Sequence, residues 1–309
     1  MRLAVVVPFL DEQESLPALL ASLAAQDRLP DRLLLVDDGS SDASPQIAEQ
    51  FTAAHPWAKV VRVPPRPRER DRLRQAHELR ALQWGVERLD EPWDVVGKVD
   101  ADLVLTPDVL STLDRELSAD PQLGVAGVRL ADPDGSLRTC PDGHVEGAVS
   151  FYRRACWEAI APLPPIIGWD TIDEVRARVH GFRVAAFTPP AGPSLHGRRM
   201  GSFDGVLRGY RRAGRAAWAY GAHPVVVLAS TATRLRHRPR VLCGASYLAG
   251  WAQAAVAGGP RAEREVRDRV RREQRDRLRG LVVARAAGRN RAGDGTALAG
   301  LAGRSGSRT

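Results

Sequence analysis

Cysteine is scarce in this chain of 309 residues, with only Cys140, Cys156 and Cys243, which lie far apart in sequence. This spacing argues against a disulfide framework and against a thiolate zinc site of the Cys-x-x-Cys type, and it fits a reducing compartment. The amino-terminal residues run directly into a strand pattern, so we expect no signal peptide. We also find no internal repeat.

Lysine is nearly absent as well. Lys59 and Lys98 are the only lysines among 45 basic residues, which we interpret mainly as a coding bias toward arginine rather than a sign of function. The formal net charge of +8 is concentrated late in the chain. A nucleic-acid-binding protein should instead carry a stripe of arginines with interleaved aromatics across its folded domain. We therefore rank nucleic-acid binding far below an enzymatic function.

Short apolar runs alternate with helical patterns through the first two thirds of the chain. The spacing predicts strands at 3–7, 33–36, 60–63, 95–99, 124–130, 147–152 and 182–187, and helices at about 16–23, 43–53, 72–89, 106–117 and 154–160. A further helical stretch follows the segment 168–174 and runs to residue 179. Such alternation is typical of a mainly parallel sheet with helices on both faces. The expected fold is therefore a Rossmann-like, three-layer α/β/α domain, followed by a helical C-terminal extension.

The predicted strand at 95–99 ends in Asp100 and Asp102, separated by one small residue. Open α/β sheets bind ligands at the carboxyl ends of their strands. Mg²⁺ or Mn²⁺ suits such a pair, because it binds one or two carboxylates and takes its other ligands from water and phosphate. The alternative is a polar turn in which an aspartate caps a helix.

Acidic turns follow two other predicted strands, and the three together resemble family 2 glycosyltransferases of the GT-A fold. Residues 5–12 (V-V-V-P-F-L-D-E) are similar to that family's opening segment, residues 36–42 (V-D-D-G-S-S-D) to its second motif, and residues 99–102 (V-D-A-D) to its D-x-D strand end. Gly168-Trp169-Asp170, with Arg176 and Gly181 following, resembles the segment that carries the catalytic base. The likeness covers about residues 1–190.

By this resemblance the donor is a nucleotide diphosphate sugar. Asp38 is expected to contact the base, and Asp100 the ribose or a metal-bound water. Asp102 is expected to bind Mg²⁺ or Mn²⁺, with His196 as a further ligand. The other residues expected to bind the nucleotide sugar are Pro8, Glu12 and Arg74. For Asp38 the alternative is a turn residue that supports Gly39.

The chain also departs from the family pattern. Leu10 stands where the family has an aromatic residue, Asp11 replaces an asparagine, and Trp169-Asp170 replaces the usual acidic pair of the base segment. Several arginines are weaker candidates for phosphate contacts, with solvent-exposed positions as the alternative: Arg80, the arginines of the stiff loop 64–68, and those of the loop 196–201.

An acceptor hydroxyl needs a general base near the anomeric carbon of the donor sugar. The resemblance favours Asp170 for this role. Asp173 and Glu174 compete, although one of them could instead be a helix N-terminal charge stabilised by the dipole. A single base and an in-line displacement imply inversion at the anomeric carbon, and the family resemblance implies the same outcome.

The expected function is therefore transfer of a sugar, with inversion and a metal, to a polysaccharide, glycolipid or lipid-linked acceptor. A sugar-phosphate nucleotidyltransferase shares the layout, but it would need a glycine-rich, basic loop after the first strand, and Phe9-Leu10-Asp11-Glu12 is not one. We expect a catalytic domain over 1–200, a helical extension over 201–285 and a disordered tail over 286–309.

Two stretches of the C-terminal third, 216–233 and 241–259, lack charge apart from His223. Each is near the lower length limit for a membrane span. The arginines between them would then face away from the catalytic side, against the positive-inside tendency. We therefore expect peripheral association with the inner face of the cell membrane, placing the enzyme in the cytoplasm and in cell-envelope biosynthesis. Two buried helices or a homodimer contact are the alternatives.

Overall fold

The structure is a computed structural model that describes residues 1–65, 76–138, 140–197 and 205–286. The described residues form two compact units. The first comprises the residues up to 165 together with 176–197, and the second comprises 166–175 together with 205–286. The division falls within helix α6 (Trp169–Val179).

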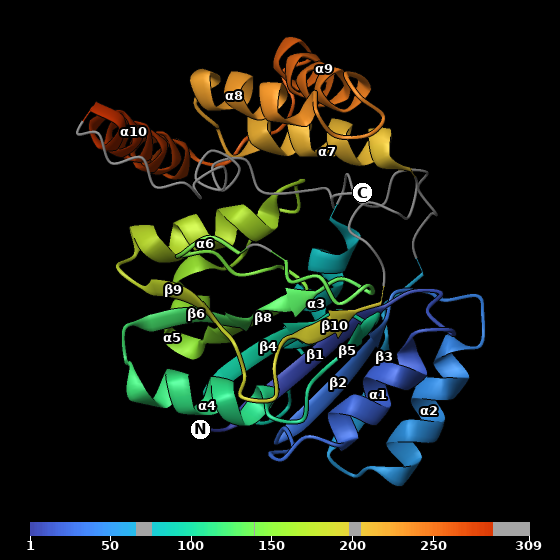
Figure 1. Ribbon diagram of the computed structural model, residues 1–309. Coiled ribbons are helices and arrows are strands. Elements are labelled where there is room, and N and C mark those ends of the chain that lie inside the picture. Colours follow the sequence, from blue (N-terminus) through green and yellow to red (C-terminus); the bar gives the residue numbers. More distant parts are fainter. Residues whose placement is uncertain (66–75, 139, 198–204, 287–309) are drawn as a thin grey trace. The chain divides into compact units, whose positions relative to one another are not determined.

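A seven-stranded sheet of order β3-β2-β1-β4-β8-β6-β9 organises the first unit (Figure 1). Its strands are β1 (Leu3–Phe9), β2 (Arg32–Asp37), β3 (Ala58–Arg62), β4 (Val95–Val99), β6 (Leu123–Val128), β8 (Val149–Arg153) and β9 (Arg183–Phe187). Neighbouring strands are parallel except at β8, which is antiparallel to both β4 and β6. The expected mainly parallel sheet is therefore confirmed.

Helices cover both faces of this sheet. The helices that belong wholly to the first unit are α1 (Leu16–Ala24), α2 (Ser44–Ala54), α3 (His77–Val86), α4 (Val109–Ala119) and α5 (Arg154–Ile160). Every residue of β1 is buried, because alternate side chains point to opposite faces and both are covered. Val5 and Val7 belong to the core that α1 and α4 share, whereas Val6 lies against Gly85 of α3. The arrangement is the three-layer α/β/α fold that the sequence predicts.

A small second sheet of order β5-β10-β7 lies within the same unit. Its strands are β5 (Leu103–Val104), β7 (Leu130–Ala131) and β10 (Ser194–His196). The single strand predicted at 124–130 is thus wrong in detail. The chain leaves the large sheet after Val128 and pairs with β10 at Leu130, so the segment divides into β6 and β7.

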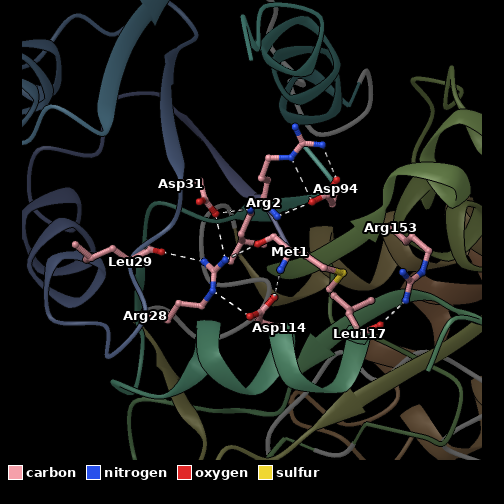
Figure 2. A network of polar contacts seen from close by, with 10 residues as sticks. Met1, Arg2, Arg28, Leu29, Asp31, Asp94, Asp114, Leu117 and Arg153 are labelled. Carbon is pink, nitrogen blue, oxygen red and sulfur yellow. Dashed lines mark hydrogen bonds and ion pairs between the residues drawn. The ribbon is translucent and has the colours of Figure 1, made fainter. Parts of the chain in front are cut away.

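Ion pairs tie the amino-terminal ends of the strands together, at the edge of the sheet where β1 and β4 begin (Figure 2). Arg2 donates to Asp94 at 2.9 Å, and Arg28 donates to both Asp31 and Asp114 at 3.1 Å. The hydrogen bonds from Arg2 lower the pKa of Asp94 to about 2. The network holds the starts of the two central strands together, so we assign it a role in stabilising the fold. It lies at the opposite edge of the sheet from the carboxyl ends of these strands.

Most helix predictions agree with the structure to within a few residues. The helix predicted at 72–89 appears as α3, which ends at Val86, and residues 66–75 lie outside the described part. In α1, Pro17 lies in the first turn, where its missing N–H costs no helical hydrogen bond. Ser15 precedes α1 but makes no side-chain cap; its hydroxyl donates to Glu12 instead.

The second unit contains α7 (Val206–Ala219), α8 (Pro224–Arg234), α9 (Leu242–Val256) and α10 (Arg264–Ala286). Its core includes Tyr210, Val227 and Tyr247. Helices α7 and α9 approach closely because Gly214 of α7 lies against the backbone of α9. A Cβ at this position would clash with the carbonyl oxygen of Tyr247. The uncharged stretch at 216–233 is not one segment, since Gly221 (φ +79°) ends α7 and Pro224 starts α8.

None of the helices in the described ranges is both long enough and apolar enough to cross a membrane. Helix α10 alternates basic and acidic side chains from Arg264 to Arg279 and buries Val266, Val270 and Gln274. The predicted disordered tail lies outside the described residues.

Candidate active site

The acidic pair lies at the carboxyl end of β4, where it meets a residue from far along the chain. Strand β10 pairs antiparallel with β5, so that His196 lies opposite Leu103. The His196 Nδ1 atom is 3.6 Å from Asp102 Oδ2, and the Gly197 N–H donates to the Asp102 carbonyl oxygen at 2.6 Å. One ligand atom each of Asp100, Asp102 and His196 lies within 4.8 Å of the others.

This set of donors fits a divalent cation. Two carboxylate oxygens and an imidazole nitrogen suit Mg²⁺ or Mn²⁺, and all three side chains are partly exposed, which leaves room for water and phosphate as further ligands. The sequence named these three residues, and the structure brings them together. Their roles in binding stay predictions.

Lys98 is a component of this region that the sequence did not single out. Its side chain is 1% exposed, and its ammonium lies 2.5 Å from Asp100 Oδ1 and in close contact with Glu78, from the first turn of α3. It also donates to the Gly147 carbonyl oxygen at 2.6 Å. Alternation along β4 puts residues 98 and 100 on one face, which is the signal that could have found it.

The charges of this group are strongly coupled. Burial alone lowers the pKa of Lys98, but attraction to Asp100 and Glu78 outweighs it, and the pKa is raised. Burial, together with repulsion from Glu78, raises the pKa of Asp100 well above its usual range, although Lys98 opposes this. A bound cation would favour the ionised carboxylates, so the cluster is well suited to receive positive charge.

The turn after β2 is held by Asp37 rather than by Asp38. Asp37 is 1% exposed, and its Oδ1 accepts from the N–H groups of Gly39 and Ser40 at 3.1 and 2.7 Å. Arg62, at the end of β3, pairs with the other oxygen at 3.0 Å. Gly39 has φ +92°, a conformation that favours glycine. The turn-supporting role considered for Asp38 therefore belongs to its neighbour.

Asp38 has a largely buried side chain, and its Oδ2 lies 3.8 Å from Nδ1 of His77 at the start of α3. Pro8 is buried within β1 and pairs in register with Val36. Asp38 and Pro8 thus lie at neighbouring strand ends. Their roles in binding a nucleoside stay predictions. His77 was not predicted, because nothing in its local sequence distinguishes it from a surface histidine.

The loops after β1 and β2 are bonded to each other. Asp11 (φ +52°) accepts from the Ser41 N–H at 2.7 Å, and its own N–H donates to Ser40 Oγ at 3.1 Å. The Glu12 N–H donates to Ser44 Oγ at 2.8 Å, and its carboxylate accepts from Ser15. Asp11, at the family's asparagine position, therefore fixes the loop. Glu12 lies in the loop between β1 and α1 and is partly exposed.

The structure says little about the arginines that the sequence offers as contacts for the nucleotide sugar or its phosphates. Arg74 lies outside the described residues, as do the arginines at positions 66, 68, 198 and 199. Arg80 is exposed on α3, consistent with the solvated position considered for it.

The candidate base segment begins α6 in the second unit. Gly168 (φ +82°) precedes the helix, and a Cβ there would lie 3.0 Å from the Ala216 Cβ of α7. Asp170 lies in the first turn and is partly exposed, whereas Asp173 and Glu174 are 2% and 3% exposed. Of the three, Asp170 is thus the acid at the helix start. Gly181 (φ +85°) follows the last turn, as in helices that end in a left-handed residue.

Comparisons with solved structures show the class of the fold. The mannosyltransferase PcManGT from Pyrobaculum calidifontis, solved with GDP-Man and Mn²⁺, has a TM-score of 0.54 at 18% identity, over 92% of this chain and 80% of that one. The structure of S. aureus TarS 1–349 in complex with UDP has a TM-score of 0.51 at 15% identity, over 83% and 72%. At these identities the likeness shows the fold alone, which is that of GT-A glycosyltransferases.

The family follows from the sequence itself. Residues 4–158, about half of the chain, match the family model described as glycosyl transferase family 2. The chain belongs to this family and is a glycosyltransferase. Among curated proteins, none matches the chain.

Proposed function

We propose that this glycosyltransferase moves a sugar from a nucleoside diphosphate sugar to an acceptor hydroxyl, with inversion and with a divalent cation. The observation that carries the proposal is the convergence of Asp100, Asp102 and His196 at the carboxyl end of β4. Asp102 and His196 hold the cation, and Asp100 contacts the ribose or a metal-bound water. When bound, Mg²⁺ or Mn²⁺ offsets the charge of the diphosphate as it leaves.

The nucleoside occupies the ends of β1 and β2 in this proposal. The Asp38 carboxylate accepts a ring N–H of the base, while Pro8 and Glu12 border the base and ribose. Asp37 and Asp11 keep the two loops in place through the bonds to Gly39, Ser40 and Ser41. PcManGT and TarS were solved with GDP-Man and UDP, respectively, which supports a nucleotide ligand for a protein of this fold.

Asp170 serves as the general base and takes the proton of the acceptor hydroxyl as the glycosidic bond forms. Its partial exposure in the first turn of α6 supports this choice over Asp173, which is buried. The Asp173 carboxylate accepts from the adjacent Glu174 N–H at 2.6 Å. One displacement at the anomeric carbon, with one base, inverts its configuration.

The acceptor proposed is a polysaccharide, glycolipid or lipid-linked sugar, and the enzyme works at the inner face of the cell membrane. The proposed catalytic domain spans residues 1–200, with the helical extension after it. The uncharged surfaces of α8 and α9 support the membrane location. Family membership favours a glycosyltransferase over a sugar-phosphate nucleotidyltransferase or a nucleic-acid-binding protein.

The test replaces the two candidate bases separately. Asp170→Asn should lower turnover by about 10²–10⁴, as expected for loss of a general base, and should leave metal-dependent nucleotide binding intact. Asp173→Asn should mainly cost stability, about 1–3 kcal/mol, because it alters a buried hydrogen-bonded group. A panel of nucleotide sugars with soluble sugar acceptors supplies the rate measurement. Near-wild-type turnover by Asp170→Asn, with turnover lost in Asp173→Asn, would transfer the role to Asp173.

A further inference from the structure

The second unit carries an unusual distribution of charge. Residues 205–262 contain nine arginines and neither aspartate nor glutamate, although the whole chain has a formal charge of only +8. A long segment of one sign of charge repels other cations and attracts an anionic partner. The partner is better identified by what surrounds the arginines than by the charge alone.

Apolar side chains are exposed beside these arginines. We call residues Leu235–Leu242, which run from the end of α8 to the first residue of α9, the α8–α9 corner. All of its residues except His237 are exposed, including Arg236, Arg238 and Arg240. Leu235, Val241 and Leu242 are 39%, 60% and 51% exposed. Basic and aliphatic side chains thus share one short stretch of surface.

The outward face of α8 extends this surface. Val225 and Leu228 are 51% and 60% exposed, and Ala232 and Leu235 are exposed at the spacing that places all four on one side of the helix. That side bears no charge until Arg236 follows it. An uncharged helix face that ends in three exposed arginines is the pattern of a helix lying in a membrane interface.

Contacts of Arg234 and His237 with the core of the second unit hold the corner in place, so its exposed apolar groups belong to an ordered surface. Arg234 is 3% exposed, its guanidinium lies 4.4 Å from the Tyr247 ring, and it donates to the Ser230 carbonyl oxygen at 3.0 Å. The Tyr210 hydroxyl and His237 Nδ1 are 2.7 Å apart. Val241 has φ +65°, which is a strained conformation for a β-branched residue.

We propose that the α8–α9 corner and the outward face of α8 dock on an anionic lipid surface. The arginines lie at the headgroup phosphates, and Leu228, Val241 and Leu242 enter the boundary with the acyl chains. A nucleic acid offers phosphate but would meet aliphatic rather than stacking side chains here. The inference rests on the proposed membrane location and names the surface that accomplishes it.

The test is vesicle flotation of the full-length protein with phosphatidylglycerol/phosphatidylcholine vesicles and with phosphatidylcholine alone. Each arginine near an anionic surface contributes about fivefold in partitioning, so the variant R236Q/R238Q/R240Q should bind on the order of 100-fold more weakly. The variant V241S/L242S should lose roughly tenfold or more, because two half-exposed aliphatic groups no longer become buried. High salt should weaken the wild type.

Matched controls come from exposed residues of the first unit. The variant R115Q/R154Q/R183Q removes three arginines that are 58%, 49% and 58% exposed, and Leu137→Ser removes a leucine that is 57% exposed. Both should bind vesicles like the wild type. Equal losses in the control and corner variants would overturn the proposal.

Two other results would also reject it. If V241S/L242S binds anionic vesicles normally while R236Q/R238Q/R240Q loses both vesicles and duplex DNA, the surface is a general polyanion site. If V241S/L242S instead dissociates a dimer and keeps vesicle binding, a second copy covers the corner. Transfer to soluble acceptors, measured in parallel, separates failure of this surface from failure of the proposed activity.

Discussion

Lys98 is one of two lysines in the chain, and it is enclosed by the carboxylates of Glu78 and Asp100. The single ammonium group of Lys98 contacts both carboxylates and therefore offsets the repulsion between their negative charges. It also fixes Asp100 Oδ1 through a direct contact, next to the proposed metal ligand Asp102. We regard Lys98 as a positioning residue for this end of β4.

Replacing Lys98 by methionine should therefore destabilise the protein by about 3–5 kcal/mol at pH 7, because a buried charge pair loses one partner. Lys59→Met is the matched control. Lys59 and its partner Asp90 are 63% and 74% exposed, so the cost should stay within about 0.5 kcal/mol. Urea unfolding measures both. Equal costs for the two variants would contradict the role of Lys98.

The Lys98→Met deficit should also depend on pH. The pKa of Asp100 is raised already, and loss of the lysine raises it further. An acid with a higher pKa in the folded than in the unfolded state binds its proton more tightly when folded, so stability increases as the pH falls. The deficit should thus be smaller at pH 5 than at pH 7. A deficit that is constant over this range would mean that packing, not charge, is lost.

At the scale of elements, helix α6 is bracketed by two glycines with positive φ, Gly168 and Gly181. Only Gly168 also has a close neighbour, since a Cβ there would meet Ala216 at 3.0 Å, whereas a Cβ on Gly181 would meet nothing within 4 Å. The first glycine therefore serves both backbone conformation and packing against α7, and the second serves conformation alone.

Alanine at the two positions separates these effects. Gly181→Ala should cost about 1–2 kcal/mol, which is the ordinary penalty of a left-handed conformation for a residue with a Cβ. Gly168→Ala should cost more, because the helix must also shift from Ala216. Denaturant midpoints of the two variants give the comparison. If Gly168→Ala is no more destabilising than Gly181→Ala, the approach to α7 has no energetic importance.

Sequence patterns predicted the elements whose signal is local. Every residue of β1 and β4 is buried, so each reads as an apolar run bounded by turns. Strands β5 and β10 are too short to show any periodicity. Their pairing nevertheless brings His196 to Asp102, and this depends on contacts between residues far apart in the chain. The break in the uncharged stretch 216–233 also has a local signal, because Pro224 starts α8.

At the scale of the whole molecule, the ends of the sheet have separate tasks. The amino-terminal edge is joined by ion pairs such as Arg2–Asp94 (Figure 2). The carboxyl edge carries the residues predicted to bind the nucleotide-sugar donor. The sequence predicted the residues of the carboxyl edge through the family motifs. It did not predict Lys98, Glu78 or His77, because their importance comes from side-chain contacts that α3 makes with Lys98 of β4 and with Asp38 after β2.

Acid should weaken the amino-terminal edge. The Arg2 hydrogen bonds lower the pKa of Asp94 to about 2. A lowered folded-state pKa stabilises the protein above the usual aspartate pKa of about 4, and this contribution is lost as the pH falls toward 2. The stability difference between wild type and Asp94→Asn should thus be present at pH 6 and disappear near pH 2. It should be modest, because both side chains are substantially exposed. Urea midpoints that differ equally at pH 2 and pH 6 would count against this linkage.

The most direct test of the central claim is calorimetric binding of nucleoside diphosphates to the full-length protein, with Mn²⁺ or with EDTA. The account predicts that the wild type binds in Mn²⁺ and loses most of its affinity in EDTA. Asp102→Asn should bind weakly in both conditions. Asp90→Asn, a control on an exposed acid, should match the wild type. Equal affinity of wild type and Asp102→Asn, with no effect of EDTA, would contradict a metal-dependent donor site at the end of β4.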